Sequence, residues 1–182
     1  MNHKYLQQFV WIMVIFLSSC NYQKSIQSFS EMQDNLYPKK NYISSTNLAA
    51  SQNIKELEKN TFTLINQYRQ SKNLPALQWN NDIVQQSRIH AQQMASGKTT
   101  FSHDGFKKRV EIISQKIPYK GAAENIASNQ GYSDPAEAAV KGWIKSPGHH
   151  KNIVGDYNLT AIGIAQNSQG MYYFNQLFIK TR

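Results

Sequence analysis

The side chains that could do chemistry in this chain are few: one cysteine, five histidines and eleven acidic residues among 182 residues. The histidines do not follow the His-Glu-x-x-His spacing that places two imidazoles on one face of a helix, so spacing alone predicts no metal centre. The lone thiol belongs to Cys20, and no motif around Ser102 or Ser146 marks an activated serine. The residues alone therefore identify no catalytic residue.

The surroundings of Cys20 predict a lipid anchor. Residues 1–8 are polar and carry Lys4, and residues 9–17 form an unbroken apolar run. At about 1.5 Å per residue this run is too short to cross a hydrocarbon layer of about 30 Å, and small residues follow it, as in a secretory signal. Leu-Ser-Ser-Cys at 17–20 resembles the bacterial lipobox, in which the thiol receives a diacylglyceryl group and cleavage leaves the cysteine as the first residue.

We therefore expect residues 1–19 to be a lipoprotein signal peptide, and residues 20–52 to comprise the lipidated Cys20 and a flexible tether. The tether shows low hydrophobicity and no lasting periodicity, which is typical of a segment without a packed core. Asn21 is not the aspartate of an inner-membrane retention signal. The expected location is extracytoplasmic and lipid-anchored, on the outer membrane if the cell has one; an ordinary cleaved signal is the alternative.

The composition narrows the choice of partner. Forty percent of the residues are hydrophobic, which is enough for one core, and the net charge of +9 is spread along the chain. The densest basic cluster, residues 107–109, is too short for a nucleic-acid stripe, and an export signal also argues against nucleic acid as a partner. With a single cysteine, no intramolecular disulfide can form, so packing must stabilise an exported domain.

Four helices are predicted from apolar periodicity and from start and stop signals. The clearest start is Asp134 as the cap, Pro135 in the first turn and Glu137 reaching back to the cap. The predicted helices run from about 53 to 71, from an Asn80 cap to Gly97, from about 107 to 114, and from the Asp134 cap to Pro147-Gly148.

The C-terminal part reads as a β-hairpin, with β-rich runs at 160–165 and 172–179. Alternate residues of the second run are apolar on both faces, with Phe174 on one face and Leu177 on the other. A sheet that is apolar on both faces must be covered on both sides, and here helices must cover it. The predicted fold class is α+β, a three-layer α–β–α sandwich with a central antiparallel sheet.

A series of short motifs runs in order through residues 64–178. They are Leu-Ile-Asn-Gln-Tyr-Arg at 64–69, Leu-Pro-Ala-Leu at 74–77, Trp-Asn at 79–80, His-Ala-Gln-Gln-Met-Ala at 90–95, Phe-Ser-His at 101–103, Glu-Asn-Ile-Ala at 124–127, Trp143 leading into Ser-Pro-Gly-His-His-Lys-Asn-Ile at 146–153, and Tyr-Phe-Asn-Gln-Leu-Phe at 173–178. Each is weak alone. In this order they resemble the bacterial branch of the CAP (SCP-like) superfamily, named for cysteine-rich secretory proteins, antigen 5 and pathogenesis-related proteins.

The resemblance implies a CAP fold for residues 53–182 and a central cleft in which His103, Glu124 and His149 converge. Two imidazoles and a carboxylate could hold a divalent metal such as zinc, with a fourth position open to water, and such a metal could support hydrolysis. In the metal-free alternative, Glu124 accepts a proton from one imidazole and orients it within a buried polar network.

Four further residues are expected to support this cleft. Asn125 and Asn152 could tie loops down through side-chain-to-backbone bonds, and Gln176 should have a buried partner or line the cleft. Ser146 stands roughly where animal members of the superfamily carry a second glutamate. That glutamate and the stapling cysteines are absent, so the sterol-binding and signalling roles of those relatives are not expected here.

Three functions remain open: a module that binds a cell-envelope peptide, glycan or lipid, a metal-dependent hydrolase, and a structural lipoprotein with a vestigial cleft. The anchor, the tether and the absence of a clear nucleophile favour the binding module. Distances distinguish the two forms of the site. Side chains converging on one point at about 2.0–2.2 Å indicate a metal, and a chain of contacts at about 2.7–3.0 Å indicates a hydrogen-bonded network.

Overall fold

The computed structural model describes residues 45–182. The predicted signal peptide, Cys20 and the predicted tether as far as residue 44 lie outside the described residues. The last part of the predicted tether, residues 45–52, is helical rather than flexible, because the helix predicted from about 53 begins at Ser45. Within residues 45–182, no helix is both long enough and apolar enough to span a bilayer.

A four-stranded sheet forms the centre of the domain, in the order β1-β3-β4-β2. The strands are β1 (Gln78–Trp79), β2 (Tyr119–Asn129), β3 (Leu159–Gln166) and β4 (Tyr172–Thr181). β4 pairs antiparallel with both β2 and β3, which confirms the predicted hairpin. The sheet as a whole is mixed rather than antiparallel, because the short β1 pairs parallel with the start of β3. The sequence pattern predicts neither β1 nor β2.

Five helices surround the sheet. They are α2 (Ser45–Ser71), α3 (Asn81–Ala95), α4 (Phe106–Ser114), α5 (Pro135–Lys145) and α6 (Pro147–Ile153). The two predicted caps are confirmed: the side chain of Asn80 accepts two backbone N–H bonds at the start of α3, and that of Asp134 accepts one at the start of α5. Glu137 does not reach back to its cap; it pairs with Lys141 at 2.9 Å.

The helix predicted to end at Pro147-Gly148 is two helices. α5 ends at Lys145, and Pro147 begins α6, since a proline lacks the N–H that a continuing helix requires but suits a first turn. This short second helix matters for the site because it carries His149.

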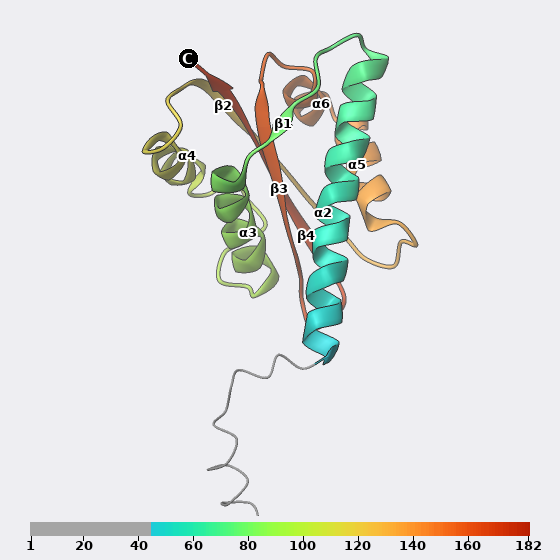
Figure 1. The fold of residues 1–182 in the computed structure, drawn as a ribbon. Coiled ribbons are helices and arrows are strands. Elements are labelled where there is room, and N and C mark those ends of the chain that lie inside the picture. The colour runs from blue at the N-terminus through green and yellow to red at the C-terminus, as the bar shows by residue number, and fades with distance from the viewer. Residues whose placement is uncertain (1–44) are drawn as a thin grey trace, which may run out of the picture. The chain divides into compact units, whose positions relative to one another are not determined.

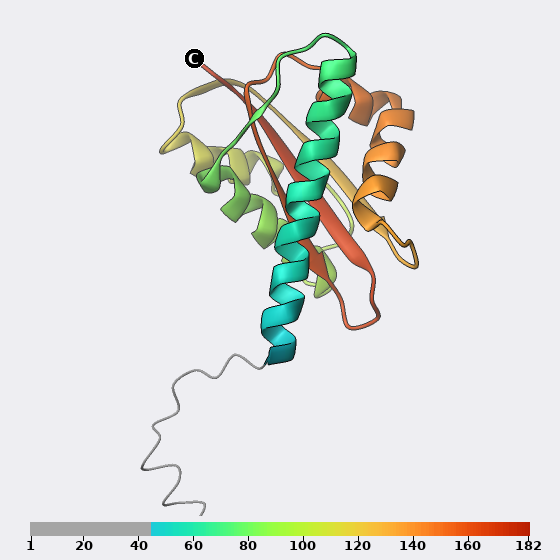
Figure 2. The same ribbon diagram turned by 45° about the vertical axis from the view of Figure 1, so that its right-hand side comes forward.

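The helices form two layers, one on each face of the sheet. α3 and α4 cover one face, and α2, α5 and α6 cover the other (Figure 1), while α2 runs along most of the length of the sheet (Figure 2). Phe174 and Phe178 of β4 pack in the same core cluster as Trp143 of α5. Leu177 and Ile179 pack in the cluster that contains residues of α3 and α4. The predicted three-layer sandwich is confirmed.

β1 pairs only with the first two residues of β3, and helices α2 and α3 cover the rest of this edge of the sheet. Gly163 lets α3 approach closely, because a Cβ atom there would lie 2.1 Å from the backbone nitrogen of Arg88. Glu58 of α2, almost fully buried, pairs with the Arg88 guanidinium and accepts the outward N–H of Ile164 at 3.3 Å. The Glu58–Arg88 ion pair thus joins the two helical layers across this edge. It also bonds the Ile164 N–H, which is then not free to pair with another strand. The β2 strand forms the other edge.

Candidate functional site

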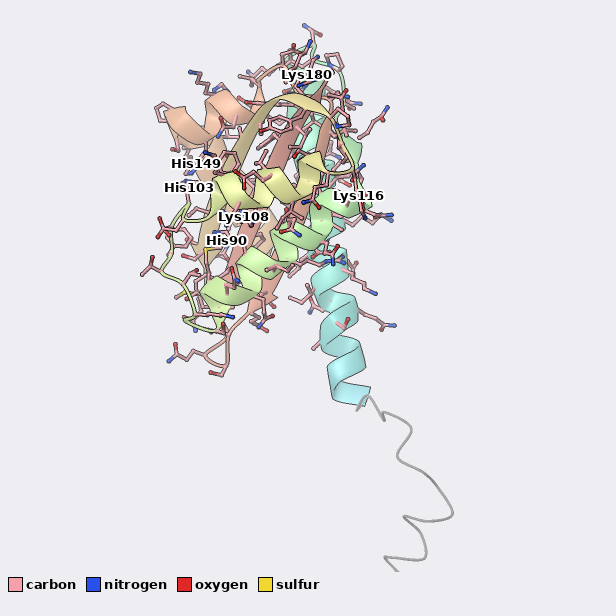
Figure 3. The ribbon with its side chains drawn as sticks, turned by 90° about the vertical axis from the view of Figure 1, so that its left-hand side faces the viewer. His90, His103, Lys108, Lys116, His149 and Lys180 are labelled. Carbon is pink, nitrogen blue, oxygen red and sulfur yellow. The ribbon has the colours of Figure 1, made fainter. Side chains whose placement is uncertain are left out.

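The three predicted site residues come from three different parts of the fold. His103 lies between α3 and α4, Glu124 lies in the middle of β2, and His149 lies in α6. Since β2 is an outer strand, segments from both helical layers meet at it. His103 and His149 lie at the same edge of the domain in Figure 3, and the charge of His103 acts on His149. The structure therefore places these residues in one region.

Glu124 is the centre of a saturated hydrogen-bond network. Its Oε1 accepts bonds from Nδ1 of His103 at 2.9 Å and from Nη2 of Arg109 at 2.9 Å. Its Oε2 accepts bonds from Nε and Nη2 of Arg109 at 3.0 and 2.7 Å and from Nδ2 of Asn175 at 2.7 Å. The carboxylate side chain is only 2% exposed, so the Arg109 guanidinium compensates a buried negative charge.

This network does not fit a metal centre built from His103, Glu124 and His149. Both oxygens of Glu124 already accept bonds from cationic or amide donors, so no lone pair of the carboxylate is directed toward a common point with the imidazoles. Within residues 45–182, no group of three or more His, Cys, Asp or Glu side chains is arranged to hold a metal ion. The contacts of the Glu124 carboxylate, at 2.7–3.0 Å, have the lengths of hydrogen bonds rather than of metal–ligand bonds. The site therefore supports no reaction step through a metal.

The contact with Glu124 sets the orientation of the His103 ring. Both oxygens of Glu124 accept hydrogen bonds from the Arg109 guanidinium, and a carboxylate has no proton to donate, so Nδ1 of His103 is the donor. In the neutral ring Nε2 then carries the lone pair. The side chain is 52% exposed, so Nε2 can accept a hydrogen bond from a bound molecule.

His149 is held by two asparagines that connect α6 to β2. Asn125 donates from Nδ2 to the backbone oxygen of His149 at 3.2 Å. Asn152 donates from Nδ2 to Oδ1 of Asn125 at 2.9 Å and to the backbone oxygen of Glu124 at 3.2 Å. Burial lowers the pKa of His149, and the positive charge that His103 can carry lowers it further. His149 therefore favours the neutral state, in which its ring can both donate and accept.

The remaining predicted residues divide between the site and the core. Asn125 and Asn152 make side-chain-to-backbone bonds of the kind expected. Gln176 is fully buried and donates to Oγ1 of Thr160 at 3.2 Å. Both residues lie in the core rather than at the site. Ser146 lies between α5 and α6 and lines the cleft described below.

Two residues of the network, Arg109 and Asn175, are not predicted as site residues from the sequence. Arg109 belongs to the basic cluster at 107–109, which read as part of a solvated surface, yet its side chain is 8% exposed and points at Glu124. Its place in the helix predicted from 107 to 114, beside apolar Val110 and Ile113, was the available signal. Asn175 stands in the Tyr-Phe-Asn-Gln-Leu-Phe motif at 173–178, where a polar residue within an apolar strand calls for a buried partner.

A cleft of about 550 Å³ lies beside this network. Residues 126–129 of β2 line one side, and the small residues Ala138, Ala139 and Gly142 of α5 line the other. Phe101 and Tyr132, which are 51% and 61% exposed, also line it and offer aromatic surface. His149 lines the cleft, whereas His103 and Glu124 lie outside its lining.

The hydroxyl groups near the histidines are not arranged for nucleophilic catalysis. Oγ of Ser102 contacts Oγ1 of Thr100 at 3.3 Å and accepts the backbone N–H of Asp104 at 3.2 Å. Among the hydrogen bonds of residues 45–182, none joins a serine or threonine hydroxyl to the ring of His103 or His149. An activated nucleophile makes such a bond to its base.

Comparisons with known proteins match most of the described domain. The family profile described as CAP, cysteine-rich secretory protein family, matches residues 62–178. The uncharacterized protein YkwD of Bacillus subtilis (strain 168) is 32% identical over 138 residues, which cover 74% of this chain and 52% of that protein. The uncharacterized membrane protein YlbC of the same strain is 32% identical over 129 residues, which cover 68% of this chain and 34% of that protein. The chain thus spans about half or less of the length of these relatives.

Two solved structures are similar to the described domain. An outer surface protein from Borrelia burgdorferi matches with a TM-score of 0.60 at 20% identity, over 70% of this chain and 95% of that chain. An extracellular protein containing a SCP domain from Bacillus anthracis strain Ames matches with a TM-score of 0.57 at 28% identity, over 70% of this chain and 41% of that chain. The similarity to the Borrelia protein shows the fold. The similarity to the Bacillus anthracis protein agrees with the family that the sequence comparisons match.

Proposed function

This chain belongs to the cysteine-rich secretory protein (CAP) family, and from that premise we propose that it is an extracytoplasmic lipoprotein whose cleft binds a component of the cell envelope. The proposed anchor is the lipidated Cys20, and residues up to the start of α2 are the proposed tether. The names of its relatives, an extracellular protein and a membrane protein, support a place outside the cytoplasm. The short apolar run that ends before Cys20 supports the anchor.

The observation that carries the binding proposal is the cleft between β2 and α5. It combines exposed aromatic surface from Phe101 and Tyr132 with a neutral-favouring imidazole at His149. A concave site with apolar walls and a few polar groups is the usual form of a ligand site. Beside it, the His103 ring is held in one orientation by Glu124, which supplies a preorganised polar contact.

The alternatives receive different support. A hydrolase that uses a metal held by His103, Glu124 and His149 is disfavoured because Glu124 is fully engaged by Arg109, Asn175 and His103. A structural role is the second candidate, since the saturated network around Glu124 ties α4, β2 and β4 together and would stabilise the fold with no ligand at all.

The binding proposal is tested by thermal unfolding of the full chain with fractionated cell envelope. We expect one fraction to raise the Tm of the wild type. Gly142 lines the cleft, and a Cβ atom there meets nothing within 4 Å, so Gly142→Phe should fill the cleft and abolish the shift, whereas Gly142→Ala should keep it. If no fraction shifts the wild type, or if Gly142→Phe shifts equally, the cleft is not the binding site and the structural role is favoured.

The anchor is tested separately in cells. We expect the wild type to incorporate labelled palmitate and to stay with membranes in high salt, and Cys20→Ser to lose both properties. Asn21→Ser keeps the thiol and serves as the control. A wild-type protein that takes up no label, or a Cys20→Ser protein that stays on the membrane as firmly as the wild type, contradicts the lipid anchor.

A further inference from the structure

The β2 strand presents main-chain groups to the cleft. Its position at the end of the strand order leaves one side without a neighbouring strand. The backbone oxygen of Ile126 accepts the indole N–H of Trp143 at 2.8 Å, and that of Glu124 accepts a bond from Asn152 at 3.2 Å. These two carbonyls therefore point away from β4. Because the direction of main-chain groups alternates along a strand, the even-numbered residues of this stretch face the cleft side.

Ser128 follows the same alternation as Glu124 and Ile126, and it is the only one of these three residues that is exposed. Its N–H and C=O point to the cleft side, as does the N–H of Ile126, and Ser128 lines the cleft. Beside it, Oδ1 of Asn129 is buried and has no hydrogen-bond partner among residues 45–182, although its Nδ2 donates to the backbone oxygen of Pro135. An unpaired buried acceptor is costly unless another molecule completes it.

The opposite wall leaves room for a backbone. Three of the four cleft-lining residues of α5, Ala138, Ala139 and Gly142, carry no side chain beyond Cβ. The fourth, Trp143, is 1% exposed and holds its indole N–H against the backbone of β2. A strand added to a sheet lies about 4.8 Å from its neighbour and needs close access wherever the two strands exchange main-chain bonds. The cleft provides such access next to Ser128, and the rings of Phe101 and Tyr132 can contact alternate side chains of an added strand.

We propose that the cleft binds an extended peptide segment, which adds to β2 as a further strand. The segment exchanges main-chain hydrogen bonds with Ser128 and accepts the N–H of Ile126, whose carbonyl already accepts from Trp143. Strand addition to an open sheet edge is a common form of peptide recognition, in which main-chain bonds give affinity and side-chain pockets give selectivity. This inference rests on the proposed function, because it names the ligand class of the same cleft. A peptide backbone repeats its N–H and C=O groups at the same spacing as β2, which the hydroxyl groups of a glycan or the chains of a lipid do not.

The test begins with a displayed library of short linear peptides, selected on the full chain purified in detergent. A selected peptide is then methylated at each backbone nitrogen in turn. We expect losses of about tenfold or more at alternate positions and little change at the positions between them, because only every second N–H of a strand faces its neighbour. A uniform pattern, or failure to select any peptide that Gly142→Phe releases, overturns the inference.

Variants of Ser128 test the protein side of the same bonds. Proline is tolerated in an edge strand where the N–H points outward, so Ser128→Pro removes one donor to the peptide. We expect about tenfold weaker binding for Ser128→Pro and wild-type binding for Ser128→Ala, which keeps the N–H. Equal affinity of the two variants contradicts strand addition. If Ser128→Pro does not fold, the methylation scan on the wild type decides.

The two proposals can fail separately. An envelope fraction that still shifts the Tm after complete proteolysis, together with a uniform methylation pattern, overturns the peptide inference and leaves envelope binding intact. Loss of the shift on proteolysis, together with the alternating pattern, supports both. Selected peptides with the alternating pattern, but no active envelope fraction, support the strand-addition site and contradict the envelope assignment.

Discussion

Replacing Arg109 with methionine should destabilise the domain strongly, because it leaves the Glu124 carboxylate buried without its cation. The side chains of Arg109 and Glu124 are 8% and 2% exposed. Methionine retains an unbranched side chain of similar length but donates none of the three hydrogen bonds that reach the carboxylate. Removing one partner of a buried pair typically costs about 3–5 kcal/mol. For a domain with about 5–15 kcal/mol of total stability, that is a large share.

The assay is urea unfolding of the full chain, followed by the fluorescence of the buried Trp143 and the half-buried Trp79. The matched control is Lys116→Met, which removes the partner of Asp82 in a pair whose side chains are 66% and 42% exposed. Exposed pairs contribute about 0–1 kcal/mol, so this variant should unfold near the wild-type midpoint.

A double variant separates the lost pair from the stranded charge. Arg109→Met with Glu124→Gln removes both charges and keeps an amide that can still contact His103 and Asn175. We expect it to be more stable than Arg109→Met alone, since replacing both members of a buried pair is less costly than breaking it. The reasoning is refuted if Arg109→Met costs no more than Lys116→Met, or if the two substitutions in the double variant simply add.

Two further predictions concern the glycines and the pH dependence. Gly163→Ala should lower the free energy of unfolding by about 3 kcal/mol or more, because the new Cβ would lie 2.1 Å from the backbone nitrogen of Arg88. Gly142→Ala in the interior of α5 should raise it by about 0.5–1 kcal/mol in the same urea assay, and equal effects of the two substitutions would contradict the packing described. Burial, and then the charge of Arg109, lower the pKa of His90, so the unfolded chain binds this proton more readily. Stability should therefore fall as the pH drops from about 7 through the ordinary histidine value of about 6.5. Urea unfolding at several pH values in this range should show that the stability of His90→Gln depends less on pH than that of the wild type. An equal pH dependence in the two proteins would argue against a buried neutral His90.

The sequence predicted the elements whose signals are local. The caps at Asn80 and Asp134 can be predicted from the sequence because a side-chain oxygen just before a helix usually accepts a backbone N–H of the first turn. The β2 strand escaped prediction because its stretch from Gly121 to Asn125 consists of small and polar residues with low strand propensity. Pairing with β4 along its length determines this strand, and pairing is a property of the fold rather than of the segment.

The site was predicted only as far as a resemblance could carry it. The motifs brought His103, Glu124 and His149 together, but they could not say whether the carboxylate was available to a metal. That depends on Arg109, whose guanidinium reaches Glu124 only when α4 lies against β2. In the sequence, a basic residue next to two lysines reads as solvent-exposed, and only the fold turns it inward. The saturation of Glu124 is therefore a tertiary property.

The closed edge at β3 has a consequence for self-association. Growth of a chain of molecules by strand pairing requires each copy to offer two open edges, one to the copy before it and one to the copy after it. Here the Glu58–Arg88 pair, together with α2 and α3, occupies one of the two. Pairing through β2 would then stop at a closed dimer, so an accessible strand at the cleft need not make the domain prone to fibre formation.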